Sequence, residues 1–497
     1  MQDGTLLAAI DLGSNSFRLE IGRIDHGHVQ RVEYIKETVR QGNGLDDERN
    51  LSPEAMQRGW DCLARFSERL GGFKRSQVRA VATQTLREAR NRDVFIAQAN
   101  QLLGFPIDVI SGREEARLIY IGVAHWLPQS AEKRLVIDIG GRSTELILGQ
   151  GYASQRTESY RLGSVAWSMK YFDNGRLHAA NFERAQVAAQ AILDEAVTGF
   201  GPTHWDVAYG SSGTVGAVAD ILAAKGYAAG TISKEGLQWL HDALLRAGHI
   251  DKIDLVGLKE DRRAVLGGGV AILRSLFELL DLTQLVVAQG ALRHGLLLDL
   301  VDREDAVTDV RSASITRLAT KFAVDTAHSH RVANTAAHFL AKLVLSAPQA
   351  HQERLQRKAR WAAHVHEIGA RISHTDYHKH GAYILDNADA PGFAQSELHR
   401  LSMLVYGHRG KLKKLSDTLN DVDFQRQLIA LRLAVIICHA RRTPDFQSLV
   451  LQKIDSGFKL DASLAWQKAH PQSTYLLHEE AAAWQKIGVQ LLINSKE

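Results

Sequence analysis

The chain has few cysteines, only Cys62 and Cys438 among 497 residues. They lie far apart in the sequence, and neither is accompanied by cysteine or histidine at the spacing of a metal-ligand pair. This excludes a disulfide framework and predicts a reduced, cytoplasmic setting. The amino terminus lacks a basic segment followed by an apolar stretch, because Asp11 interrupts the first hydrophobic run. We therefore expect neither a signal peptide nor a membrane-spanning segment.

The chain also has little net charge. Its 60 lysines and arginines are nearly balanced by 56 acidic residues, which leaves a net charge of +4. A long polyanion would have to bind through local patches and not through the overall field. We expect no nucleic-acid partner and no membrane partner. The 45% hydrophobic and 23% charged residues are typical of a soluble globular protein. At about 100–200 residues per domain, this length predicts three or four domains.

The pattern of hydrophobic residues changes along the chain. Strand-like runs alternate with helical segments in the first two thirds, which predicts an α/β fold. The expected strands lie near residues 6–12, 16–23, 29–36, 77–82, 106–110, 134–140, 144–149, 205–210 and 284–289. Helical periodicity prevails from about residue 305 to about 440, and half of the 22 histidines fall between 325 and 410. A hairpin near 448–461 and a last helix near 475–492 are expected to close the chain.

Two short segments read almost as copies of each other, Ile10 to Ser16 and Ile137 to Ser143. In each, a strand ends in Asp, turns through Gly and Ser, and is followed by a second strand. Glycine allows close backbone approach, so such a turn presents N–H groups and hydroxyls to an anion. One copy would be weak evidence, whereas two predict a phosphate clamp between two related domains.

The segment Ser111 to Ile119 begins a helix. Ser111 and Glu114 match a capping box, so Glu114 is expected to be structural. Glu115 lies on the apolar face with Leu118 and Ile119, where a carboxylate is either a working base or an acid that serves the helix dipole.

Two further strand-to-helix turns are candidate phosphate loops. In Thr83 to Ala89, Arg87 stands one turn into the helix and can bind phosphate oxygens with its planar fork, or it can lie on a solvated face. The turn Gly210 to Thr214 is the second candidate, although glycine-serine turns of this kind are common.

Together these motifs resemble the exopolyphosphatase and guanosine pentaphosphate phosphohydrolase family, a branch of the actin, sugar-kinase and Hsp70 ATPase superfamily. The segments that carry the resemblance are Ala9 to Phe17, Thr83 to Ala89, Ile110 to Ile119, Ile137 to Leu146, Gly210 to Thr214, Gly290 to Arg293, His366 to Gly369 and His378 to Leu385. The resemblance implies an α/β fold with two actin-like (ribonuclease H-like) domains and a cleft between them, at 1–127 and 128–305. An all-helical HD-type domain at 306–443 and a small α+β carboxy-terminal domain at 444–497 would follow. It also implies a homodimer.

The resemblance assigns a site as well. The family's catalytic glutamate falls on Glu115 and its phosphate-contacting arginine on Arg87, and its magnesium-associated acids fall on Asp138 and Glu145, with Mg²⁺ as the cofactor. Phosphoanhydride hydrolysis needs charge neutralisation and a water held in line, which Mg²⁺ and a general base would supply. The residues expected to bind phosphate are Asp11, Gly13, Ser14, Asn15, Ser16, Gly140, Gly141, Arg142, Ser143, Gly210, Ser211, Ser212 and Gly213.

Two places depart from the family pattern. Arg142 stands where the family usually has a third glycine, and it either adds a phosphate contact or turns outward. Gln289 and His294 replace the two acids of the family's Asp-Gly-Ala-Leu-Arg-Glu-Gly segment, so we expect no contact from those acids here.

The histidine-rich segment allows two hypotheses. HD-type phosphohydrolases bind metals through a His, a His-Asp pair and a distant Asp, but here the pair would be His366-Glu367 and no terminal aspartate follows. We therefore expect structural and solvated histidines and no metal. The second hypothesis is a basic groove for a long polyanion, with a solvated helix face as the alternative. Its residues would be His408, Arg409, Lys411, Lys413, Lys414, Arg432, Arg441 and Arg442.

The main functional prediction is an exopolyphosphatase that releases orthophosphate from the end of inorganic polyphosphate. The alternative is hydrolysis of the 5′ γ-phosphate of guanosine pentaphosphate (pppGpp), because both activities share these motifs. A more distant alternative is a (p)ppGpp or phosphate sensor without turnover, against which Glu115, Asp138 and Glu145 argue. A sugar-type kinase would need an adenine pocket and an aspartate base, and the sequence contains no recognisable sign of either.

Overall fold

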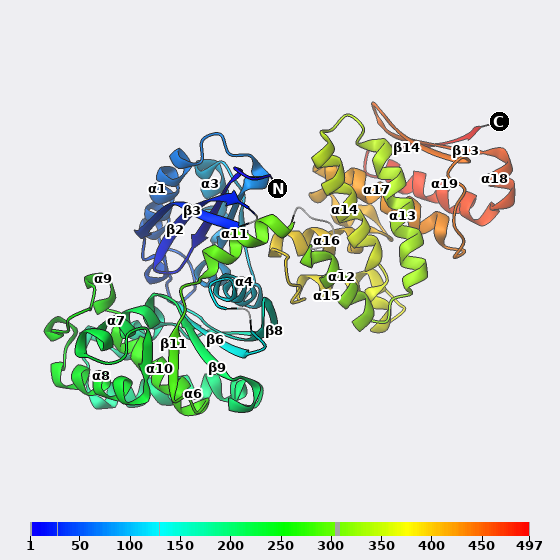
Figure 1. Ribbon diagram of the computed structural model, residues 1–497. Coiled ribbons are helices and arrows are strands. Elements are labelled where there is room, and N and C mark those ends of the chain that lie inside the picture. Colours follow the sequence, from blue (N-terminus) through cyan, green and yellow to red (C-terminus); the bar gives the residue numbers. More distant parts are fainter. Residues whose placement is uncertain (1, 27, 129, 304–308, 497) are drawn as a thin grey trace. The chain divides into compact units, whose positions relative to one another are not determined.

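The computed structural model describes residues 2–26, 28–128, 130–303 and 309–496, with Arg303 and Lys496 described by their backbone alone. The chain divides into two compact units, Met1–Asp309 and Val310–Glu497. Figure 1 colours the first unit from blue to green and the second from yellow-green to red. The predicted domain boundary at residues 305 and 306 lies outside the described residues.

Two sheets with related topology form the first unit. Their strand orders are β3-β2-β1-β4-β5 and β10-β11-β9-β6-β7-β8. In each sheet an antiparallel hairpin, β1 with β2 or β6 with β7, lies beside a parallel strand, β4 or β9. The duplicated alternation that the sequence predicts is therefore confirmed. The strands are β1 (Leu6–Leu12), β2 (Ser16–Asp25), β3 (His28–Thr38), β4 (Val78–Ala82), β5 (Ile107–Val109), β6 (Lys133–Ile139), β7 (Thr144–Gln150), β8 (Ala153–Tyr160), β9 (Val207–Ser211), β10 (Thr231–Ser233) and β11 (Gln284–Val287).

Two helices of this unit pack together and contact both sheets (Figure 1). These are α4 (Gly112–Ala124) and α11 (Leu292–Arg303), whose apolar residues share one core with residues of β1, β4, β6 and β7. This core fixes the start of α4, and hence Glu115, relative to both hairpins. The other helices are α1 (Pro53–Arg69), α2 (Gln84–Glu88), α3 (Arg92–Leu103), α5 (Ser164–Tyr171), α6 (Ala179–Phe200), α7 (Gly213–Lys225), α8 (Lys234–Ala247), α9 (Glu260–Arg263) and α10 (Leu266–Leu279).

The second unit is helical and ends in a three-stranded sheet, ordered β12-β13-β14. One hydrophobic core joins its helices to this sheet, so the predicted small carboxy-terminal segment does not have a separate core. The elements are α12 (Val310–Lys321), α13 (Thr326–Leu343), α14 (Gln349–His364), α15 (Tyr377–Asp386), α16 (Gln395–Gly407), α17 (Val422–Cys438), β12 (Leu449–Ile454), β13 (Gly457–Ser463), α18 (Leu464–Ala469), α19 (Pro471–Gln485) and β14 (Gln490–Lys496).

Two sequence-based predictions for this unit are wrong in part. The last helix ends at Gln485 and not near residue 492, because the chain continues as β14, which pairs in parallel with β13. Leu491 faces the core while Leu492 is exposed, which is the two-residue period of a strand. Arg432 cannot line a basic groove, because it is buried and its guanidinium donates to Glu480.

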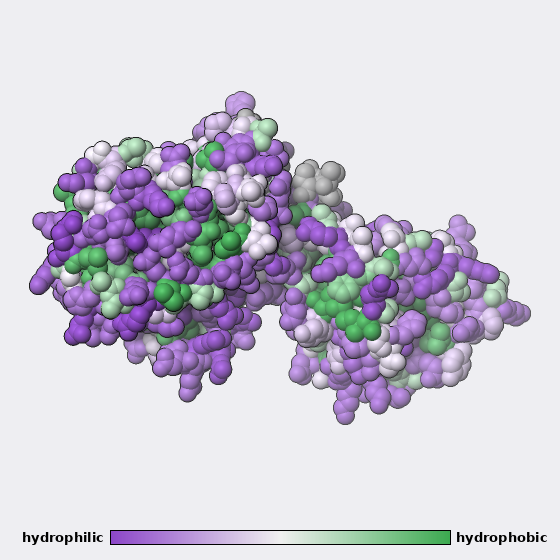
Figure 2. Space-filling model, turned by 90° about the horizontal axis from the view of Figure 1, so that it is seen from below, coloured by the Kyte–Doolittle hydropathy of each residue, from purple (hydrophilic) through white to green (hydrophobic). Residues whose placement is uncertain are grey.

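The surface agrees with the composition. Figure 2 shows hydrophilic side chains over most of the visible face of both units, with smaller hydrophobic patches between them. Among the helices described, none combines the length and apolar character needed to span a bilayer.

Candidate active site

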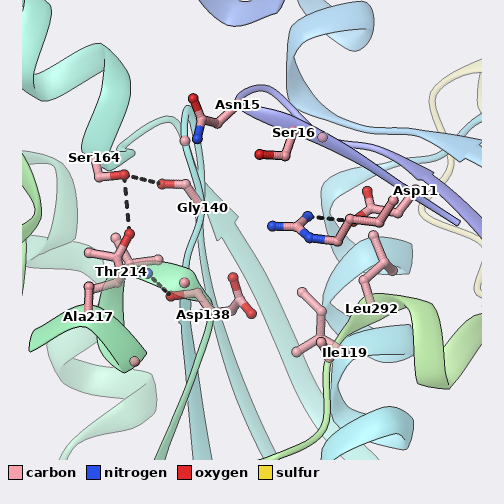
Figure 3. A pocket seen from close by; sticks show the side chains of 18 of the residues that line it. Asp11, Asn15, Ser16, Ile119, Asp138, Gly140, Ser164, Thr214, Ala217 and Leu292 are labelled. Carbon is pink, nitrogen blue, oxygen red and sulfur yellow. Dashed lines mark hydrogen bonds and ion pairs between the residues drawn. The ribbon is translucent and has the colours of Figure 1, made fainter. Parts of the chain in front are cut away.

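The two predicted phosphate turns meet in the first unit. The turn after β1 and the turn after β6 both line a cleft of about 370 Å³ (Figure 3). They are in contact, since a Cβ on Gly141 would lie 3.1 Å from the Cβ of Ser14. Glycine at this position allows the close approach of the two turns. The lining includes Asp11, Gly13, Ser14, Asn15, Ser16, Gly140, Gly141 and Ser143.

The third predicted loop lies on the wall formed by α7. The Ser212 hydroxyl accepts hydrogen bonds from the backbone N–H groups of Thr214 and Val215 and so caps the helix. The Thr214 hydroxyl donates to Ser164 Oγ (3.2 Å), and Ser164 Oγ donates to the carbonyl of Gly140 (3.1 Å), as Figure 3 shows. The helix start and the second turn are therefore held together as one surface.

Two buried polar groups in the cleft are unsatisfied. Asn15 Nδ2 and Ser16 Oγ have no hydrogen-bond partner among the described residues. Both residues line the cleft (Figure 3). A buried donor without a partner costs free energy, so these two groups fit a site that an anion completes. The cleft also carries five cationic side chains, Arg18, Lys36, Lys259, Arg262 and Arg293.

Glu115 reaches the cleft from the first turn of α4. Ser111 caps this helix, its hydroxyl accepting from the N–H of Glu114, and Glu115 N–H donates to the carbonyl of Ser111 (2.9 Å). The side chain of Glu115 is 10% exposed. Burial raises the pKa of Glu115 to about 7, against the opposing charge of Arg87. A carboxyl with this pKa can accept a proton from water near neutral pH.

The capping-box prediction is only half correct. The Ser111 cap is confirmed, but the carboxylate of Glu114 is buried and accepts two hydrogen bonds from Arg117, both 2.8 Å long. Arg117 also binds Asp299 of α11 (2.6 Å). Glu114 is thus structural, as expected, but through this ion-pair network.

Arg87 is directed at the acid and not at the cleft. Its Nη1 donates to Glu115 Oε2 (3.1 Å) and to the carbonyl of Ile110 (2.8 Å), and its Nε donates to Gln84 Oε1 (3.0 Å). Its side chain is 14% exposed, which is inconsistent with a solvated face. In this structure Arg87 therefore forms an ion pair with Glu115.

Asp138 and Glu145 are cross-strand partners on β6 and β7. Asp138 faces the cleft, whereas Glu145 lies behind it and accepts a hydrogen bond from Ser159 (2.8 Å). Burial raises the pKa of Asp138 to about 6 and the pKa of Glu145 well above its usual range, where the charges of Glu115 and Asp138 add to the effect. Enclosed carboxylates of this kind bind protons unless a cation compensates them, and their oxygens are the ligands that Mg²⁺ prefers. The donor set fits a hard divalent cation.

The two hairpins differ at one register position. Asp11 pairs with Arg18 across β1 and β2, where Asp138 pairs with Glu145 across β6 and β7. Arg18 Nη1 forms an ion pair with Asp11 Oδ2 at 2.9 Å. The first hairpin therefore pairs its aspartate with an arginine, whereas the second places two carboxylates opposite each other. A cation is favoured at the second hairpin.

Some predicted site residues lie outside the cleft lining: Arg87, Arg142, Glu145, Gly210 and Ser211. Arg142 forms an ion pair with Glu88 (3.2 Å) and donates to the carbonyl of Gly42 (3.0 Å), so its guanidinium is engaged by these two groups. Ser211 is buried and donates to the carbonyl of Gly290 (3.0 Å). Both Arg142 and Ser211 thus bond to protein groups and lie outside the cleft lining, and their predicted contact with phosphate stays a prediction.

Other cleft residues were not predicted. Arg18 could have been found, because antiparallel pairing across the short turn Gly13 to Asn15 sets it opposite Asp11. The sequence did not indicate a role in the cleft for Lys36, Lys259 or Arg262, since each lies in a segment whose pattern is typical of solvated surface. Arg262 nevertheless packs against the start of α7, where a Cβ on Gly213 would lie 2.2 Å from Arg262 Nη2.

Comparisons with known proteins agree along the whole chain. Residues 20–304 match the Ppx/GppA phosphatase family, and residues 310–481 match Ppx/GppA phosphatase, domain III. A protein of Vibrio cholerae named guanosine-5′-triphosphate,3′-diphosphate pyrophosphatase is 39% identical over 495 residues, 98% of each chain.

Solved structures share the fold over about three fifths of this chain. An exopolyphosphatase from Cytophaga hutchinsonii aligns with a TM-score of 0.55 and 22% identity, over 60% of this chain and 98% of that one. The Aquifex aeolicus PPX-GPPA enzyme aligns with a TM-score of 0.51 and 23% identity, over 59% and 99%. The sequence matches, the full-length relative and this fold lead to one conclusion: the chain belongs to the Ppx/GppA phosphatase family.

Proposed function

We propose that the protein hydrolyses the terminal 5′ phosphate of guanosine pentaphosphate to orthophosphate and guanosine tetraphosphate. The observation that carries the chemistry is one cationic cleft that contains the buried acid Glu115 and the unpaired donors of Asn15 and Ser16. The choice of substrate follows the full-length similarity to a protein named for this nucleotide. It corresponds to the alternative of the sequence-based prediction and not to its exopolyphosphatase reading.

The cleft would first hold the phosphate chain. The turns after β1 and β6 and the capped start of α7 offer backbone N–H groups and hydroxyls, and Asn15 and Ser16 would gain the partners that they lack. Arg18, Lys36 and Arg262 would neutralise the charge that spreads over the phosphoryl oxygens in the transition state. Substrate binding thus supplies positioning and electrostatic stabilisation.

Glu115 would act as the general base. It would accept one proton from a water molecule as that oxygen bonds to the terminal phosphorus, and the phosphoanhydride bond to the leaving phosphate oxygen breaks. Arg87 would hold the carboxylate in the orientation seen in the structure. Asp138, with Glu145 behind it, would hold Mg²⁺, which neutralises phosphoryl oxygens when bound.

The nucleoside would lie along α7. Beyond Thr214, one face of this helix presents Gly216, Ala217 and Asp220 to the cleft. A Cβ on Gly216 would meet nothing within 4 Å, so there is open space above the helix. Helical rise places Asp220 about 10 Å along the axis from Gly213. A carboxylate there would repel a phosphate chain but can accept two N–H donors of guanine.

The test compares two substrates at matched concentration of terminal phosphate in the presence of Mg²⁺. We expect kcat/KM for pppGpp to exceed that for long-chain polyphosphate by at least roughly tenfold, because only the nucleotide can use the α7 contacts. A higher kcat/KM for polyphosphate would contradict this proposal and support the exopolyphosphatase function instead. Hydrolysis of neither would contradict both.

A further inference from the structure

A group of metal-ligating side chains lies in the second unit, which the proposed hydrolysis does not use. His328 belongs to α13, and His366 and Glu367 follow α14. Each offers one ligand atom, and these atoms lie within 4.8 Å of one another. The two histidines are only 3% and 1% exposed. The cluster is therefore enclosed by the helical core.

The imidazole of His366 is oriented as in many metal sites. Its Nδ1 lies 2.7 Å from the carbonyl of Ala363, which can only accept, so Nδ1 carries the proton and Nε2 keeps its lone pair. Metal-bound histidines usually donate their second ring N–H to such a carbonyl. Burial favours the neutral imidazole, the form that binds a metal.

His328 carries an unsatisfied polar atom. Its Nδ1 is buried and has no hydrogen-bond partner among the described residues, while its Nε2 lies 3.9 Å from Glu367 Oε1. Burial of an unpartnered polar group costs free energy. Coordination through either ring nitrogen would tie this side chain to the cluster.

We infer that His328, His366 and Glu367 form a binding site for a divalent transition metal of the zinc type. Two imidazoles and one carboxylate are a common protein ligand set for zinc, with an open fourth position for water. Mg²⁺ prefers all-oxygen sites, so it would not compete here. Metal–ligand bonds of about 2 Å place tetrahedral ligand atoms roughly 3.4 Å apart, so the cluster must contract by no more than about 1.5 Å.

Arg441 is a positively charged side chain next to the proposed metal site. Its Nη2 lies 3.5 Å from Glu367 Oε1, and its Nη1 lies 2.6 Å from Asp325 Oδ2. In the metal-free chain this guanidinium compensates the carboxylate of Glu367. Because Arg441 keeps its shorter bond to Asp325, Glu367 can turn to a metal without leaving the arginine unpaired.

In the sequence, the absence of a terminal aspartate after His366-Glu367 argued against a metal. The structure brings His328 of α13 to the same place as this pair, so three candidate ligands meet without that aspartate. The site also lies in the unit that does not contain Glu115 and Asp138.

The test measures zinc directly. Full-length protein is treated with EDTA, dialysed into buffer with millimolar Mg²⁺ to occupy oxygen-rich sites, and titrated with Zn²⁺ by calorimetry, with bound metal counted by mass spectrometry. We expect one zinc per chain, and His366→Gln and Glu367→Gln should each weaken binding by at least roughly tenfold. Glu367 is half-buried, so its variant tests the site even if the histidine variant fails to fold.

The matched control is a second histidine pair in the same unit. His330 and His364 have ring centroids 4.7 Å apart, and among the described residues they belong to no group of three metal-ligating side chains. Replacement of both by Gln should leave the zinc affinity unchanged, and Arg441→Gln should strengthen it, because Glu367 then loses its competing cation. Absence of zinc binding in the wild type would overturn the inference. Equal loss of zinc in the control, or weaker binding in the Arg441 variant, would overturn it as well.

Discussion

Replacement of Glu115 by Gln should slow hydrolysis and stabilise the metal-free protein at the same time. Burial raises the pKa of this acid from 4.5 to about 7. One pKa unit corresponds to about 1.36 kcal/mol, so a shift from 4.5 to about 7 means that the charged carboxylate destabilises the fold by roughly 3 kcal/mol above pH 7. Glutamine resembles the neutral acid in size and removes this cost. The charged Glu115 carboxylate would thus lower the stability of the metal-free fold while it supplies the general base.

The sign depends on pH. Below pH 4.5 the acid is protonated in both the folded and the unfolded chain, so wild type and variant should be equally stable. The advantage of the variant should grow between pH 4.5 and about 7 and be complete above that. Urea unfolding in EDTA at pH 5 and pH 8 measures it. Kinetics should show a loss in kcat of about 10²–10⁴-fold, the usual value of a general base.

A neighbouring acid serves as the control. Glu114→Gln changes an adjacent carboxylate that is paired with Arg117, so it should destabilise the protein, by about 3–5 kcal/mol for a broken buried ion pair. Opposite signs at the two positions would separate a functional acid from a structural one. The reasoning is refuted if Glu115→Gln is no more stable than wild type at pH 8 and keeps turnover within a few-fold.

Three more predictions concern the same cleft. Arg87→Gln removes the charge that lowers the pKa of Glu115, so the acidic limb of the plot of kcat/KM against pH should move to higher pH; an unmoved limb would disprove the orienting role. EDTA should abolish phosphate release and Mg²⁺ should restore it, whereas Asp138→Asn should require at least roughly tenfold more Mg²⁺ for half-maximal rate; release that continues in EDTA would exclude the metal. Asp220→Ala should raise KM for pppGpp by roughly tenfold and leave polyphosphate hydrolysis unchanged; equal loss for both substrates would remove Asp220 from nucleoside recognition.

Local patterns were enough to predict the parts of the site that belong to one segment. Asp11 and Asp138 end strands, and the Gly and Ser residues after them form the turns expected from their chemistry. The position of Glu115 on an apolar helix face conflicts with its charge and marked it as a candidate base, and the family resemblance then assigned it that role. Such conflicts are visible in a sequence, because they depend on spacing alone.

Contacts between distant segments could not be predicted. Arg87 was expected on phosphate, but its bond to Glu115 depends on how β4 and α4 pack. The sequence left two roles open for Arg142. Its ion pair with Glu88 joins two segments that are distant in the sequence, so no local pattern could predict it. Lys36 of β3 and Arg262 of α9 enter the cleft because segments far apart in the sequence meet there. A homodimer and a cytoplasmic location stay predictions.

The most direct test of the proposed chemistry follows oxygen from water into product. The protein is incubated with pppGpp and Mg²⁺ in ¹⁸O-labelled water, and the products are analysed by mass spectrometry. If water attacks the terminal phosphorus, the released orthophosphate carries one ¹⁸O and the guanosine tetraphosphate carries none. Label in the nucleotide, or release of pyrophosphate in place of orthophosphate, would contradict the account.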